Sequence, residues 1–82
     1  MIVKKSVNIS GHRTSISIEE QFWEMLREIS NHYNKSINSM VLDIDKNRDI
    51  NTNLSSAIRL FILNHLKTTS FQGKIITNKK SW

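Results

Sequence analysis

Hydrophobic and polar side chains alternate along residues 13–18, whose sequence is RTSISI. Alternation with a period of two is typical of a β-strand with one covered face, here the face that carries Ile16 and Ile18. Such a strand needs a partner, because a lone strand leaves its backbone donors and acceptors unpaired. Residues 6–9 also alternate, and two arrangements are open to them: a hairpin across Gly11 or an extension of the same edge.

Three segments with helical periodicity follow this strand. Residues 19–33 place an apolar stripe opposite the glutamates and Arg27. A second helix is expected to begin after Ser36, whose side chain suits a helix cap. A third helix is expected over residues 54–67. It is apolar around most of its circumference, so in a short chain we expect it to lie at a subunit interface.

The predicted order is therefore a strand, a helix, a tight turn and a second helix. This order is awkward for a monomer but natural for a homodimer in which two such strands pair antiparallel across a twofold axis. Arg13, Ser15 and Ser17 then point outward from a two-stranded ribbon, and we expect them to contact DNA bases. Such a ribbon fits the major groove, where arginine reads guanine and serine bonds to several base edges. The predicted dimer core beneath the ribbon comprises Ile16, Ile18, Phe22, Leu26, Ile29, Ile37, Met40, Val41 and Ile44.

The charge distribution favours a polyanionic partner. The net charge is +5, and Lys4, Lys5 and Arg13 precede the first acidic residue. This balance suits contact with DNA, although a basic tail that only aids solubility accounts for it as well. The chain has no cysteine, which excludes disulfides and thiolate metal sites. It also has neither an apolar run long enough to span a membrane nor a signal-peptide core, so we expect a cytoplasmic protein.

Several segments resemble the ribbon-helix-helix family of bacterial DNA-binding proteins. Residues 34–40, NKSINSM, look like the family's turn between its two helices, with Asn34 in place of the usual glycine. The segments SVNISGHRTSISIEEQFWEML and NLSSAIRLFIL are similar to a subgroup with a GHRTS entry and an added third helix. The resemblance covers about residues 6–66.

This resemblance implies a mainly α ribbon-helix-helix fold with a third helix. It also implies a phosphate clamp at the start of the second helix, where free N–H groups and a partial positive charge are available. The residues expected to contact phosphate by this route are Lys35, Ser36, Ile37 and Asn38. Lys4, Lys5 and His12 are expected as further phosphate contacts.

We thus expect a ribbon-helix-helix domain over residues 1–67 and a basic, flexible tail over residues 68–82. The predicted function is that of a homodimeric transcriptional regulator that binds double-stranded DNA. An alternative is an antitoxin-like or other protein-interaction module, in which the tail folds on a partner protein.

Residues 43–54, DIDKNRDINTNL, support a competing interpretation as a calcium-binding loop, because oxygen side chains occupy its first, third, fifth and seventh positions. Such a loop needs glycine at its sixth position and a bidentate glutamate at its twelfth, where this stretch has Arg48 and Leu54. We therefore expect a helix end and a connecting loop here. The histidines lack metal-ligand spacing and there is no nucleophile–base arrangement, so the sequence predicts no enzyme, catalytic residue, metal or cofactor.

Overall fold

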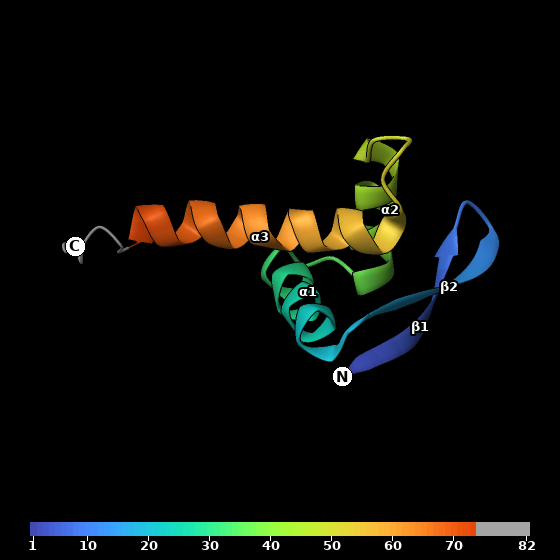
Figure 1. Ribbon diagram of the computed structural model, residues 1–82. Helices are drawn as coiled ribbons and strands as arrows, with labels where there is room; N and C mark the ends of the chain where they lie inside the picture. The colour runs from blue at the N-terminus through green and yellow to red at the C-terminus, as the bar shows by residue number, and fades with distance from the viewer. Residues whose placement is uncertain (74–82) are drawn as a thin grey trace.

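The computed structural model describes residues 1–73, with the side chains of residues 1–68. Two strands, β1 (Ile2–Ile9) and β2 (His12–Glu19), form an antiparallel hairpin. Three helices follow: α1 (Glu20–His32), α2 (Ile37–Asn47) and α3 (Leu54–Gly73). Figure 1 shows α3 crossing the other two helices, with the hairpin turn extending beyond them on the far side from the C-terminus. The predicted order of a ribbon, two helices and a third helix is confirmed, but the ribbon seen here is formed within one chain, and the predicted pairing of strands across a dimer stays a prediction.

A two-residue turn closes the hairpin. Ser10 and Gly11 both have positive φ, 51° and 84°, as a type I′ hairpin turn requires. The register runs from Ile2 opposite Glu19 to Ile9 opposite His12. Of the two arrangements open to the first segment, the hairpin is therefore the one formed, and β1 begins earlier in the chain than its alternation indicated.

One face of the hairpin covers a single hydrophobic core. Val7, Ile16 and Ile18 point inward from the two strands, and Ile18 is fully buried. The predicted core residues are buried within the chain, except that Phe22 and Ile37 are partly buried. The core also includes side chains that the prediction omitted, namely Val7, Trp23, Ala57, Ile58 and Ile62.

The turn between α1 and α2 has the expected geometry. Asn34 adopts φ 58°, the left-handed conformation for which many proteins use glycine and which asparagine tolerates. The hydroxyl of Ser36 accepts a hydrogen bond from the backbone N–H of Ser39 at 3.0 Å, so the predicted cap of α2 is confirmed.

The segment weighed as a calcium loop is divided between α2 and the connection to α3. Asp43 and Asp45 lie on α2, where Asp43 pairs with Lys35 and Asp45 accepts a hydrogen bond from Arg48 at 2.8 Å. The lysine's hydrogen bond holds the pKa of Asp43 below its ordinary value. These carboxylates thus serve as ion-pair partners. No group of three or more histidine or acidic side chains suited to a metal ion occurs among the described residues.

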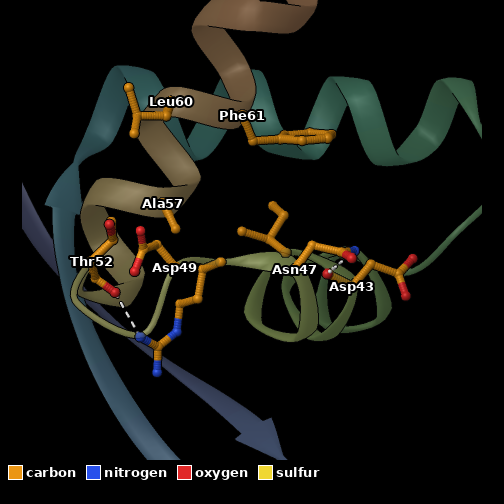
Figure 2. A pocket seen from close by; sticks show the side chains of 9 residues that line it. Asp43, Asn47, Asp49, Thr52, Ala57, Leu60 and Phe61 are labelled. Atoms are coloured by element: carbon orange, nitrogen blue, oxygen red, sulfur yellow. Dashed lines mark hydrogen bonds between the residues drawn. The ribbon is translucent and has the colours of Figure 1, made fainter.

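A hollow of about 330 Å³ lies between this connection, α2 and α3. Ala57 and Phe61 on α3 face α2 across it, while Arg48 donates a hydrogen bond of 2.6 Å to the carbonyl of Thr52 (Figure 2). Leu60 lines the same hollow and is 55% exposed. The α2–α3 contact therefore leaves apolar surface open to solvent.

Helix α3 continues to Gly73, past its predicted end at residue 67. Asn53 caps it by accepting a hydrogen bond from the N–H of Ser56 at 2.9 Å. No helix within the described residues is long and apolar enough to cross a membrane. Most of the predicted tail, and with it the predicted protein-partner site, lies outside the described residues.

Candidate nucleic-acid interface

The outer face of the hairpin is polar from Lys4 to Asn8 on β1 and from Arg13 to Ser17 on β2. Arg13, Ser15 and Ser17 on β2, which the sequence marked for base contact, are all exposed on this face. The β1 residues directly opposite them are also exposed and polar: Asn8, Ser6 and Lys4. At the α1 end of the hairpin this face also carries Ile2 and Glu19, which lie opposite each other, and the Glu19 carboxylate pairs with Arg59. From Lys4 to Asn8 and from Arg13 to Ser17 the face carries only cationic and neutral polar groups.

The N-terminus of α2 lies beside the outer edge of β1. The Asn38 side chain accepts a hydrogen bond from the N–H of Asn8 at 2.8 Å and donates one to the Asn8 carbonyl at 3.0 Å. Both backbone groups of Asn8 therefore point away from β2. In an antiparallel ladder, this makes Asn8 and Arg13 a non-hydrogen-bonded pair, in which the side chains lie close together.

The first turn of α2 keeps donors available to an anion. The N–H of Ser39 is occupied by Ser36, and the N–H of Met40 by the Ser36 carbonyl. In the described part of the chain, the N–H groups of Ile37 and Asn38 donate to no protein acceptor. Asn38 thus holds the ribbon with its side chain while its backbone N–H remains available at a helix N-terminus.

The remaining residues predicted to contact phosphate lie in different places. Lys4 shares the outer face of the hairpin, and His12 is exposed beside the hairpin turn. Lys35 is exposed next to the α2 N-terminus but pairs with Asp43. Lys5 lies on the inner face of β1, with its ammonium 5.6 Å from the ring centroid of Trp23, so the structure does not bring it to the outer face.

Helix α3 holds the outer edge of β2. The hydroxyl of Ser55 donates a hydrogen bond of 2.8 Å to the Ser17 carbonyl, and Arg59 donates one of 2.7 Å to the Glu19 carboxylate. The arginine's hydrogen bond holds the pKa of Glu19 below its ordinary value. Nearer the turn, the same edge borders a hollow of about 770 Å³ whose lining includes Ser15. Each edge of the hairpin is therefore fastened to a different helix.

The sequence-based prediction missed two members of the outer face, Ser6 and Asn8. Their signal was the alternation of residues 6–9, which places both side chains on one face. The role of the Asn38 side chain left no local signal, because its partner lies 30 residues earlier in the chain.

A polar two-stranded ribbon resting on two helices, with the second helix starting at the ribbon's edge, defines a ribbon-helix-helix architecture. The chain belongs to this family: the model of the ribbon-helix-helix domain matches residues 2–66. Members of the family are typically DNA-binding transcription regulators. No curated protein and no solved structure matches the chain.

Proposed function

We propose that the protein is a DNA-binding transcriptional regulator that inserts the outer face of its hairpin into the major groove and binds backbone phosphate with the N-terminus of α2. The observation that carries this proposal is the exposed polar face that bears Arg13, Ser15 and Ser17. It lies beside the N–H groups of Ile37 and Asn38, which have no acceptor among the described residues.

The length of each side chain on this face determines which atoms of the DNA it can contact. Arg13 is long enough to donate two hydrogen bonds to the O6 and N7 atoms of guanine, the commonest specific contact in the major groove. Ser15 and Ser17 are short, so they contact base edges only where the strand itself lies deep in the groove. The phosphate contacts at Ile37 and Asn38 set that depth, since phosphate contacts fix position and base contacts supply sequence preference.

We also propose that the protein acts as a homodimer, as its sequence predicted. The exposed apolar surface of α3 supports this, because Leu60 and Leu63 are 55% and 52% exposed on adjacent turns. Covering these two leucines would remove apolar area from water without using either edge of the hairpin.

Replacement of Arg13 by alanine tests the proposed binding mode. We expect Arg13→Ala to weaken binding to a preferred duplex by roughly 5- to 150-fold, the range for a lost bidentate base contact. The melting temperature should not change, because Arg13 is exposed. Arg27→Ala is the matched control, since Arg27 is 53% exposed on α1 and pairs with Glu24. Equal affinity of the Arg13→Ala variant and the native protein would refute this mode of binding.

A further inference from the structure

The two strands of the hairpin carry the same pattern of side chains. Residues 4–9 read KKSVNI and residues 13–18 read RTSISI. Position by position, both have a cation, a polar residue, serine, a β-branched apolar residue, a small polar residue and isoleucine. The repeat is hard to see in the sequence because the two segments are identical at only two positions, Ser6 with Ser15 and Ile9 with Ile18, which are not adjacent.

The register aligns this repeat with twofold symmetry. Ser6 lies opposite Ser15 at the centre, and the flanking pairs are Lys4 with Ser17 and Asn8 with Arg13. A half-turn about an axis through the central serine pair exchanges the strands and places each side chain on one of the same kind. This is the symmetry of a ribbon built from two identical strands, yet one chain forms it here.

Each outer edge of this ribbon is held at one residue by a side chain from a helix. Asn38 occupies the backbone of Asn8 on the β1 edge, and Ser55 occupies the carbonyl of Ser17 on the β2 edge. Two copies that paired their β2 strands about Ser15 would need the backbone of Ser17 to bond to Arg13 of the other copy. The Ser17 carbonyl, which would accept this bond, already accepts a hydrogen bond from the hydroxyl of Ser55.

The width of the major groove provides a second, independent argument. Adjacent strands lie about 4.8 Å apart, so pairing two intact hairpins through β2 would give four strands spanning about 14 Å between the outer backbones, before side chains are counted. The major groove is about 12 Å wide. A single two-stranded hairpin fits, whereas the four-stranded sheet does not.

We propose that one chain supplies both strands of the DNA-reading ribbon, with β1 in the place that the partner's strand takes in a ribbon formed across a dimer. This rests on the proposed function. Asn8 and Lys4 then contact DNA alongside Arg13. Asn8 lies directly opposite Arg13, and an asparagine amide can bond bidentately to the N6 and N7 atoms of adenine. Because Asn38 holds the Asn8 backbone, the residue that reads the base and the phosphate-binding helix end form one unit.

Disulfide trapping tests which strands pair, independently of DNA. The chain has no cysteine, so introduced cysteines are the only thiols. Ser6 and Ser15 lie two positions from the Asn8–Arg13 pair and so form another non-hydrogen-bonded pair, whose short Cβ separation suits a disulfide. The Ser6→Cys/Ser15→Cys variant should lose its free thiols on oxidation and remain a monomer on a non-reducing gel.

The single variant Ser15→Cys provides the opposite test, because residue 15 would face its own copy in a ribbon made by two β2 strands. It should form a linked dimer no faster than Glu28→Cys, a control at an exposed position on α1. Faster linkage of the Ser15→Cys variant, whether through direct pairing or through entry of a second strand into the adjacent hollow, would overturn the proposal.

DNA binding tests the new contacts on a duplex that the native protein prefers. Asn8→Ala should weaken binding by roughly 5- to 150-fold, and Lys4→Ala should lower the slope of log affinity against log salt by about one. If Arg13→Ala weakens binding but Asn8→Ala and Lys4→Ala do not, β1 is not part of the reading ribbon and the proposed function stands. If the native protein prefers no duplex, the proposed function fails, and the disulfide result still reports how the strands pair.

Discussion

Asn38 connects the two parts of the proposed interface, and its removal provides a quantitative test of the structure. The change to alanine deletes one hydrogen bond of 2.8 Å from the N–H of Asn8 and one of 3.0 Å to its carbonyl. It leaves the cap at Ser36 and the backbone N–H groups of the first turn in place.

The expected loss follows from these two bonds. Each contributes about 0.5–1.5 kcal/mol net, which gives about 1–3 kcal/mol for the pair. Two effects reduce this figure: water can replace the amide at an exposed strand edge, and alanine favours a helix by up to about 0.7 kcal/mol. We therefore expect the free energy of unfolding to fall by about 1 kcal/mol, or about 4–8 °C in melting temperature for a domain of this size.

Urea unfolding followed by circular dichroism measures this difference, with Asn31→Ala as the control. Asn31 is exposed on α1, and its side chain makes no hydrogen bond within the described residues, so the control should stay within about 0.5 kcal/mol of the native protein. DNA affinity should fall further in Asn38→Ala than in Asn31→Ala, because a loosened β1 no longer holds its fixed distance from the α2 N-terminus. Indistinguishable stabilities of the two variants would show that the Asn38–Asn8 contact adds nothing to the stability of the fold.

Two further predictions concern α3. The lowered pKa of Glu19 means that its pair with Arg59 stabilises the fold above the ordinary carboxyl pKa of about 4.3 and stops doing so as the pH falls through the lower folded value. Arg59→Gln should therefore lose less stability than the native protein on acidification through that window, as measured by thermal melts, and equal losses would contradict the assignment. The double variant Leu60→Lys/Leu63→Lys should shift the protein toward monomer in sedimentation equilibrium while its helix content is retained, and an unchanged association state would place the homodimer contact elsewhere.

Much of the fold could be predicted because its signals are local. The alternation of residues 13–18 identified β2 and its inward Ile16 and Ile18 without knowledge of their partner. The caps at Ser36 and Asn53 and the left-handed Asn34 depend on backbone groups only a few residues away. Physical rules that act over one helical turn are readable directly from the sequence.

The parts that could not be predicted depend on distant residues. Lys4 and Lys5 precede the alternating residues 6–9, and the register shows that Lys4 shares the outer face with Ser17 while Lys5 shares the inner face with Ile16. The contacts of Asn38 with Asn8 and of Ser55 with Ser17 join positions 30 and 38 residues apart, so no local pattern marks them. Polar residues that fasten a strand edge look like ordinary surface residues in the sequence.

The family match identifies the domain as ribbon-helix-helix, and the central proposal is that its hairpin reads DNA. The most direct test is a selection of the native protein against a pool of random duplexes, followed by affinity measurements at several salt concentrations. We expect one set of related duplexes to be enriched and the logarithm of its affinity to fall steeply and linearly with log salt, because cationic and helix-end contacts release counterions from phosphate. A pool that stays random, or an affinity that does not change with salt, would contradict the claim that this hairpin reads DNA.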